Sequence, residues 1–257
     1  MTEATTGWAL VDGRAMPLAE ASIPVTDVGF THGYSVFETL LAIPGRDPAQ
    51  NLARLRLSGS AAGIDVPSDA LLQHEIAAVA EELGGRAVVR ITITGDGRRV
   101  VWATPIDQAR WNRAVRCITG EHRDDAFVDG SVKHRSRMGW MLSVRQAGVD
   151  EMLLVDHRGR FTEGTSCAVL AVVSGAVHTA AWDRRILRST TLERLLEHAE
   201  RLSIPIVREG ASAAGPFDAL YVASTTRGIA PVVELDGQAL PGWDPVGEKL
   251  READTLS

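Results

Sequence analysis

A β-hairpin signal at residues 86–105 constrains the fold of this chain more than any other segment. RAVVRITITGDGRRVVWATP consists of two runs rich in valine, isoleucine and threonine on either side of Gly95-Asp96-Gly97. Such runs favour extended backbone, and a short glycine-containing connection between them is typical of an antiparallel hairpin. The segment WALVDGRAMP at 8–17 repeats the pattern around an Asp-Gly pair. We therefore expect antiparallel pairing, which a doubly wound parallel sheet does not provide.

Helical segments separate these strands in the first hundred residues. In DPAQNLARLRLSGSAAG, Asp47 is the expected N-cap, Pro48 suits the first helical position, and Gln50 completes a capping box. A second helix is expected to start at Ser68 and to stop at the glycine pair 84–85. Strands and helices are mixed without strict alternation, and this order predicts an α+β fold class.

The pattern breaks at PIDQARWNR, residues 105–113, and we predict a domain boundary there. A chain of 257 residues is long enough for two domains of moderate size. The predicted N-terminal α/β domain covers residues 1–106, a linker covers 107–113, and the C-terminal domain covers 114–257.

The second half combines further strands with two helices. One helix is expected over 134–147 with Gly148 as its C′ residue, and another over 190–204, with Thr190 as cap and Glu193 completing a capping box. We expect the last ten or so residues to be frayed. The apolar face of the second helix is predicted to contain Leu192, Leu195, Leu196, Ala199 and Leu202. The expected strands lie within 114–120, 151–164, 168–180, 218–224 and 229–237.

The composition argues against several classes of protein. A formal net charge of −6 disfavours a nucleic-acid or anionic-membrane partner. The two cysteines form no Cys-x-x-Cys pair and the histidines are scattered, so we expect no metal site. The N-terminal segment lacks a basic stretch followed by an apolar one, and no apolar run reaches about 18 residues. We therefore expect a cytoplasmic protein without a signal peptide or a membrane span.

The segment SVKHRSRMGW at 131–140 places Lys133 between a strand-like approach and a predicted helix, in a chain that otherwise mostly uses arginine. A desolvated lysine can lose its proton and attack a carbonyl to form a Schiff base, which arginine cannot do. A solvated charge at the start of a helix is the alternative interpretation. The choice between the two depends on the other segments of the chain.

Two clusters of hydroxyl groups are candidates for binding a phosphate. In ILRSTTLERLL, Thr190 and Thr191 would stand at the positive end of a helix dipole, where anions bind well. In VASTTRGIAP, Thr225 and Thr226 follow a predicted strand, at the kind of exit where ligand sites often lie. Arg54, in the helix NLARLRLSG, either reaches the same phosphate or belongs to a solvated stripe. A plain N-cap and a plain turn are the alternatives for the two hydroxyl clusters.

Glu163 in FTEGTS is a carboxylate at the end of a strand, followed by glycine and small hydroxyl residues. Alone it is a turn residue. Beside a pyridine ring, a carboxylate keeps the ring nitrogen protonated and makes the ring an electron sink. Lys133, Glu163 and the two hydroxyl clusters together are what a pyridoxal 5′-phosphate site requires.

In this order along the chain, the segments resemble the class IV aminotransferases, which are fold-type IV pyridoxal-phosphate enzymes. That group includes D-amino-acid and branched-chain aminotransferases and aminodeoxychorismate lyase. The resemblance runs from about residue 8 to about residue 240. It rests on DVGFTHGYSVFETL (27–40), NLARLRLSGSAAGI (51–64), VKHRSRMGW (132–140), FTEGTSCAV (161–169), ILRSTT (186–191) and STTRGIAPV (224–232).

The resemblance implies a two-domain fold-type IV architecture, with a small N-terminal α/β domain and a larger C-terminal α/β barrel-like domain. It implies pyridoxal 5′-phosphate as cofactor, with Lys133 forming the Schiff base, Glu163 on the pyridine nitrogen and Leu187 against the ring. It also implies a homodimer. The residues that would bind the phosphate are Arg54, Thr190, Thr191 and Thr225.

Four further residues bear on the substrate that the resemblance implies. Thr226 matches the residue near the substrate carboxylate, and Phe30 replaces the tyrosine of the D-amino-acid aminotransferases. Arg137 either binds a substrate carboxylate or caps a helix, and Arg98 either clamps a carboxylate or belongs to a solvated turn. KHRSR is closer to the Lys-His-x-x-Arg of aminodeoxychorismate lyases than to the KxGGNY of branched-chain enzymes.

Three functions fit these features. The first is a transaminase that moves an amino group from a D-amino acid or a related primary amine to a 2-oxo acid. The second is a reaction like that of aminodeoxychorismate lyase, which would release 4-aminobenzoate and pyruvate. Both use the same lysine, carboxylate and phosphate-binding residues and differ in the fate of the carbanion. The third, a relic that binds cofactor without turnover, is disfavoured by the intact Lys133 and Glu163, and we favour the transaminase.

Overall fold

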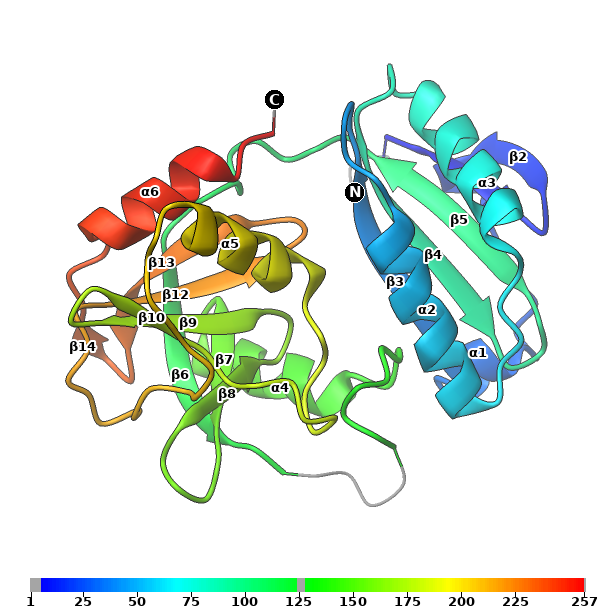
Figure 1. The fold of residues 1–257 in the computed structure, drawn as a ribbon. Helices are drawn as coiled ribbons and strands as arrows, with labels where there is room; N and C mark the ends of the chain where they lie inside the picture. Colours follow the sequence, from blue (N-terminus) through cyan, green and yellow to red (C-terminus); the bar gives the residue numbers. More distant parts are fainter. Residues whose placement is uncertain (1–5, 124–127, 257) are drawn as a thin grey trace. The chain divides into compact units, whose positions relative to one another are not determined.

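The computed structural model describes residues 6–123 and 128–256. The chain divides into two compact units (Figure 1). Of the described residues, the first unit contains 6–107 and 128–136, and the second contains 108–123 and 137–256. Lys133 therefore lies in the first unit, whereas we placed it in a C-terminal domain from the sequence.

The first unit is built on a five-stranded antiparallel sheet. Its strands are β1 (Trp8–Val11), β2 (Arg14–Pro17), β3 (Ser35–Ala42), β4 (Ala87–Thr94) and β5 (Arg99–Thr104), in the spatial order β2-β1-β5-β4-β3. Both predicted hairpins are confirmed, because β1 pairs with β2 and β4 with β5. In the first turn, Asp12 and Gly13 have φ values of 51° and 85°. Two successive left-handed residues are what a type I′ hairpin turn requires.

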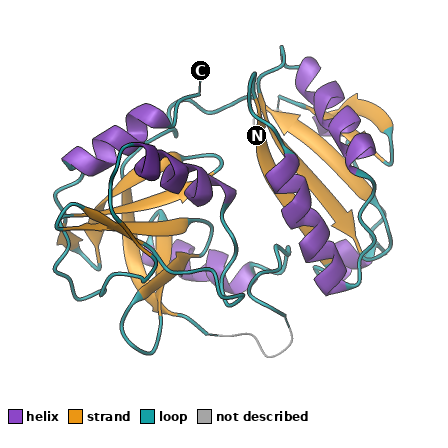
Figure 2. Ribbon diagram, viewed as in Figure 1, coloured by secondary structure: helices purple, strands orange, loops and turns teal. Residues whose placement is uncertain are grey.

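Two helices, α2 (Ala49–Ala62) and α3 (Asp69–Glu81), cover one face of this sheet (Figures 1 and 2). Two shorter helical segments, η1 (Leu18–Glu20) and α1 (Val28–Thr31), precede β3. Burial of aliphatic side chains holds the helices on the sheet. The buried cluster includes Leu52, Leu55, Leu72, Ile76, Val79, Val89, Ile91, Ile93 and Val101.

The start of α2 differs from the prediction. Pro48 occupies the N-cap position without a side-chain cap, and the Asp47 carboxylate accepts the N–H of Ala49 at 2.9 Å. The Asp47 side chain therefore forms a short turn with the N–H of Ala49, just before the helix begins. The predicted capping box with Gln50 is wrong. The predicted cap of α3 is confirmed, because the Ser68 hydroxyl accepts a hydrogen bond from the first turn of that helix.

The second unit is built on nine strands, six of which pair in a ring. They are β6 (Val115–Glu121), β7 (Glu151–Val155), β8 (Phe161–Gly164), β9 (Ala168–Val173), β10 (Ala176–His178), β11 (Ile206–Val207), β12 (Ala219–Ser224), β13 (Gly228–Leu235) and β14 (Gln238–Ala239). The ring runs β9-β12-β13-β6-β7-β8 and closes because β8 also pairs with β9. Each of the six strands contributes to one buried cluster, through Val115, Leu153, Phe161, Val169, Leu220 and Ala230. The unit is therefore barrel-like.

Three helices complete the second unit: α4 (Met138–Ala147), α5 (Thr190–Arg201) and α6 (Pro245–Ala253). α5 and α6 pack against β9 and β12 through a separate apolar cluster that includes Leu170, Leu195, Leu196, Tyr221 and Leu250. In the described part of the chain, no helix combines the length and the apolar character that crossing a bilayer requires.

The predicted helix after Lys133 begins only at Met138. The Lys133 carbonyl accepts the N–H of Phe37 at 2.9 Å, and the N–H of Arg135 donates to the Ser35 carbonyl at 3.2 Å. Because β3 takes these backbone groups, the KHR segment runs beside that strand and cannot form the first turn of a helix. The predicted range 134–147 was therefore wrong at its start, although its end at a left-handed glycine is confirmed.

The start and the end of α5 also differ from the prediction. Its N-cap is Ser189, whose hydroxyl accepts the N–H of Leu192 at 3.2 Å, and not Thr190. Serine and threonine are comparable caps, and Ser189 has the extended backbone that a cap needs. The Glu193 carboxylate faces two arginines, so the predicted capping box is wrong. Leu202 lies just beyond the helix and is 45% exposed, unlike the rest of the predicted apolar face.

The C-terminal helix α6 was not predicted, since we expected this part of the chain to fray. Asp244 is its N-cap and accepts the N–H groups of Val246 and Gly247 at 3.3 and 2.8 Å, with Pro245 in the first turn. The hydroxyl of Tyr221, a fully buried residue of β12, also donates to Asp244 at 2.7 Å. A proline that follows a good capping residue was the signal for this helix.

We expect Asp244→Ala to lower the free energy of unfolding by about 2 kcal/mol, since it removes a helix cap and the acceptor of a buried hydroxyl. Urea unfolding followed by circular dichroism measures this difference. Glu252→Ala, an exposed change on the same helix, is the control and should stay within about 0.5 kcal/mol of the natural chain. Equal effects of the two changes would contradict this account of α6.

Candidate active site

Lys133 is half-buried in the first unit, on the strip of chain beside β3. Its N–H donates to the Ser58 hydroxyl of α2 at 3.1 Å, while its carbonyl accepts from Phe37. The backbone of Lys133 is thus fixed to a strand on one side and a helix on the other. Because both backbone groups are hydrogen-bonded, the position of the Lys133 Cα, from which the side chain extends, is fixed.

A buried ion pair lies close to this lysine. Glu38 of β3 is fully buried, and Arg54 of α2 is 8% exposed. The guanidinium donates twice, from Nε to Glu38 Oε2 at 2.8 Å and from Nη2 to Oε1 at 2.7 Å. Burial alone would raise the pKa of Glu38, but the positive charges of Arg54 and Lys133, with the Arg54 hydrogen bonds, hold that pKa below its ordinary value. Glu38 is therefore a carboxylate at neutral pH.

Phe37 provides an aromatic surface for two cations of this segment. The Lys133 Nζ lies 4.8 Å from the centroid of its ring, and the Arg135 Cζ lies 4.1 Å from it. Both distances are within the range of a cation–π interaction. The ring thus limits the directions that the Lys133 side chain can take.

In the second unit, Glu163 lies on β8 and is half-buried. Its Oε2 accepts the N–H of Leu187 at 3.2 Å. Two predicted cofactor residues that are far apart in sequence are therefore neighbours in this unit. The contact fixes the Glu163 carboxylate relative to the segment that leads into α5.

The two predicted hydroxyl clusters also belong to the second unit. Thr190 and Thr191 are the first residues of α5, at the positive end of the helix dipole, and Thr191 is buried. Thr225 and Thr226 follow β12 in the turn that leads to β13, and both are half-buried. Each cluster therefore lies at the end of a regular element, as the sequence suggested.

Arg137 stands at the N-cap position of α4, but its side chain does not cap that helix. Its Nη2 donates to the carbonyl of Thr165, and its guanidinium lies 4.9 Å from the Trp140 ring centroid. Burial lowers the pKa of Arg137, while the negative charges of Glu151 and Glu163 act in the opposite direction. Of the two alternatives for Arg137, the helix cap is therefore excluded.

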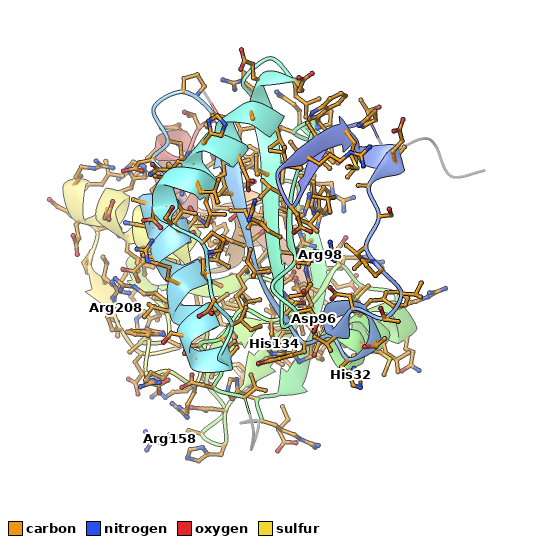
Figure 3. All side chains as sticks on the ribbon, turned by 90° about the vertical axis from the view of Figure 1, so that its right-hand side faces the viewer. His32, Asp96, Arg98, His134, Arg158 and Arg208 are labelled. Carbon is orange, nitrogen blue, oxygen red and sulfur yellow. The ribbon has the colours of Figure 1, made fainter. Side chains whose placement is uncertain are left out.

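Arg98 and Phe30 also lie in the first unit. Arg98, which is labelled in Figure 3, pairs with Asp12 at the β1–β2 turn. Its guanidinium also lies 3.6 Å from the buried Asp27, which caps α1. The Arg98 guanidinium is therefore already engaged by two carboxylates of its own unit. Phe30 lies on α1 and is 65% exposed.

Each unit thus gathers its own subset of the predicted residues. The first unit joins Lys133 and Arg54 to Glu38, which we did not single out from the sequence. Its signal was a single charged residue inside the otherwise uncharged and mostly apolar run SVFETLLAI, because a charge is rarely placed in such a run unless a partner compensates it. The second unit joins Glu163 to Leu187 and places Arg137 within reach of the same negative charge.

Comparison with known sequences gives consistent matches over most of the chain. The sequence model of the family described as amino-transferase class IV matches residues 35–235. A putative branched-chain-amino-acid aminotransferase of Methanocaldococcus jannaschii is 28% identical over 272 residues, which cover 94% of this chain and 93% of that protein. A D-alanine aminotransferase of Bacillus licheniformis is 22% identical over 260 residues, which cover 92% and 91%.

Solved structures share the fold. A branched-chain aminotransferase from Thermoproteus uzoniensis, determined with norvaline, has a TM-score of 0.83 and 22% identity, with 96% of this chain and 93% of that chain covered. The PLP-bound form of a hypothetical aminotransferase from Mycobacterium tuberculosis has a TM-score of 0.85 and 22% identity, with 96% and 97% covered. The predicted fold class, α+β with fold-type IV architecture, is thereby confirmed.

Proposed function

Because the chain belongs to the class IV aminotransferases, a family of pyridoxal-phosphate-dependent enzymes, we propose that it transfers an amino group from a D-amino acid or a related primary amine to a 2-oxo acid. The family, the cofactor and the enzyme class were expected from the sequence and are confirmed. When bound, pyridoxal 5′-phosphate supplies an electron sink for the negative charge that develops on the substrate carbon. The choice of substrate is the proposal.

The polar groups of this chain fit that cofactor. The half-buried Glu163 carboxylate, oriented by the Leu187 N–H, would keep the pyridine nitrogen protonated, and the Leu187 side chain would pack against the ring. A guanidinium and hydroxyl groups at the start of a helix suit a phosphate. The residues that we assign to the phosphate are Arg54, Thr190, Thr191 and Thr225.

Lys133 is the residue that would join the cofactor covalently, through a Schiff base. Its backbone is held by Phe37 and Ser58, and its Nζ lies over the Phe37 ring. A lysine held in this way presents its amine from a fixed starting point, which favours reaction at one position. Once released, the same amine would move the proton between the substrate Cα and the cofactor C4′.

The Arg137 guanidinium carries the proposal that the substrate has a carboxylate. It is a partly buried cation of the same unit as Glu163, and its side chain turns inward to Thr165 and not to solvent at the helix start. A buried guanidinium is well suited to a carboxylate, which it can bind through two parallel hydrogen bonds. We assign Thr226 to the same carboxylate and Phe30 to the substrate side chain. Arg98 is retained only as a secondary candidate because of its two carboxylate partners.

The D configuration rests on likeness to D-alanine aminotransferases, which match about as much of the chain as the putative branched-chain relative does. The lyase reaction stays the second candidate because of the KHRSR segment. A homodimer is proposed on the family resemblance alone. The family membership does not depend on these finer assignments.

The test compares D-alanine, L-alanine and L-leucine as donors to 2-oxoglutarate, with the purified enzyme and added cofactor. We expect D-alanine to exceed both L-amino acids by about tenfold or more in kcat/KM, equivalent to roughly 1.4 kcal/mol of discrimination. A preference for L-leucine would contradict the proposed configuration. Release of 4-aminobenzoate from aminodeoxychorismate without any amino acceptor would establish the lyase in its place.

A further inference from the structure

The first residue of β7, Glu151, is a buried carboxylate with several donors. It is 2% exposed, and its oxygens accept from the hydroxyls of Thr165 and Ser166. The N–H of Met152 donates to Oε1 at 3.3 Å, and the Arg227 Nη1 lies 3.5 Å from Oε2. A buried charge with this number of partners is compensated, because each oxygen is hydrogen-bonded and a cation lies beside it.

These partners come from two separate loops. Thr165 and Ser166 follow β8, directly after the end of the strand that carries Glu163. Arg227 follows Thr225 and Thr226 in the turn between β12 and β13. One carboxylate on β7 therefore holds both loops. In each loop, at most two residues lie between a partner of Glu151 and a residue that we assign to the cofactor or the substrate.

Backbone hydrogen bonds support the same connection. The Arg227 Nη2 donates to the Asp150 carbonyl at 3.1 Å, so this guanidinium bridges the side chain and the backbone at the start of β7. The Thr165 N–H donates to the Met152 carbonyl at 3.0 Å. Arg227 is 8% exposed, and a cation buried to this degree needs a fixed negative partner.

Thr165 extends the network to Arg137. Its hydroxyl donates to Glu151, while its carbonyl accepts from the Arg137 guanidinium. A shift of Thr165 would therefore move the acceptor that orients Arg137. The chain of contacts runs from Arg227 through Glu151 and Thr165 to Arg137, entirely within the second unit.

We propose that Glu151 is a positioning residue, whose carboxylate fixes the loops that carry Glu163 and Thr225–Thr226 and, through Thr165, the Arg137 guanidinium. This inference rests on the proposed function, because it uses the roles assigned there to Glu163, Thr225 and Arg137. We assign Glu151 no contact with the cofactor or the substrate, because the partners that the structure gives it are groups of the chain itself. Its charge matters more than its shape, since its partners are hydroxyl donors and a buried cation.

The test is Glu151→Gln, which keeps the size of the side chain and removes its charge. We expect the Kd of pyridoxal 5′-phosphate, measured by absorbance titration of apoenzyme, to rise about tenfold, the factor that one charge-assisted hydrogen bond supplies. We expect the KM of D-alanine to rise by a similar factor, with a smaller change in kcat. The groups that lose their fixed position bind the cofactor and the substrate, whereas Lys133 is held by other contacts.

The matched control is Glu75→Gln in the first unit. Glu75 is also a buried carboxylate, and it accepts from Arg99 Nε and Nη2 at 2.7 and 2.8 Å. This variant should lower the unfolding midpoint but leave the cofactor Kd unchanged. A second pair of variants examines the Thr165 hydroxyl alone. Thr165→Val removes the donor to Glu151 and should raise the cofactor Kd. Thr165→Ser retains the donor and should have the Kd of the natural enzyme.

An unchanged Kd in Glu151→Gln and Thr165→Val would overturn the inference, and so would an equal rise in Glu75→Gln. If Glu151→Gln does not fold, the two Thr165 variants decide the question by the same titration. Cofactor binding does not depend on which amine is the substrate. Failure of the D-alanine assay with the natural enzyme would therefore refute the proposed substrate without affecting the Kd comparison.

Discussion

Lys133→Ala is expected to reduce amine transfer by roughly 10⁴-fold or more, the scale seen when a covalent catalytic group is removed. The visible absorbance band of the bound cofactor should shift to that of the free aldehyde, because no Schiff base with the protein can form. Initial rates and an absorbance spectrum of the same preparation measure both effects. The chain contains only two lysines, Lys133 and Lys249, so the loss should be specific.

Lys249→Ala is the matched control for this experiment. Lys249 is exposed on α6, and its removal should leave both the rate and the spectrum as in the natural enzyme. Lys133→Arg keeps the positive charge beside Glu38 and the ring of Phe37 but cannot form a Schiff base. Activity of Lys133→Ala within about tenfold of the natural enzyme would be incompatible with covalent catalysis by this residue.

Glu38→Ala is expected to lower the free energy of unfolding by about 3–5 kcal/mol, since it leaves the buried Arg54 guanidinium without its carboxylate. Cofactor affinity should fall as well, because Glu38 orients the guanidinium that we assign to the phosphate. Urea unfolding and absorbance titration of apoenzyme measure the two quantities. A loss below about 1 kcal/mol would mean that the Glu38–Arg54 pair contributes no more than an exposed one.

The double variant Glu38→Ala/Arg54→Met separates the loss of the pair from the exposure of a lone charge. Removal of both partners should be less damaging to stability than Glu38→Ala alone, because no buried cation remains.

Acidification gives an independent check of the Glu38–Arg54 pair. The pKa of folded Glu38 lies below its ordinary value of 4.5. The contribution of the Glu38 carboxylate to the free energy of unfolding is therefore complete above that pH and is lost as the pH falls through the folded pKa. In Glu38→Ala, this part of the pH dependence of the free energy of unfolding should be absent.

Local signals predicted the regular parts of the fold. The Asp12-Gly13 turn, the glycine after α4 and the Ser68 cap each depend on the conformational preference of one or two residues, which the sequence states directly. The error at the start of α5 came from two adjacent residues, Ser189 and Thr190, that are about equally good as caps. At α2 the Asp47 carboxylate instead forms a turn with the N–H of Ala49, and Pro48 takes the N-cap position. The helix α6 was missed although Asp244-Pro245 is a local signal of the same kind.

Non-local pairings could not be predicted in the same way. The strip around Lys133 is extended because it pairs with β3, almost a hundred residues earlier in the chain. Glu38 stood out only as a charge in an otherwise uncharged strand, and its partner Arg54 is known only from the fold. Glu151 likewise has a role only beside its partner Arg227. The order of motifs along the chain was sufficient for the family, whereas the supporting carboxylates required the fold.

The measurement that tests the central claim most directly is mass mapping of the attachment site. The enzyme is loaded with pyridoxal 5′-phosphate, reduced with borohydride to make the link permanent, digested and analysed by mass spectrometry. The account predicts a single modified peptide that carries the cofactor on Lys133. Modification at Lys249 or at the N-terminal amine in place of Lys133, or no modification of enzyme that has bound the cofactor, would contradict it.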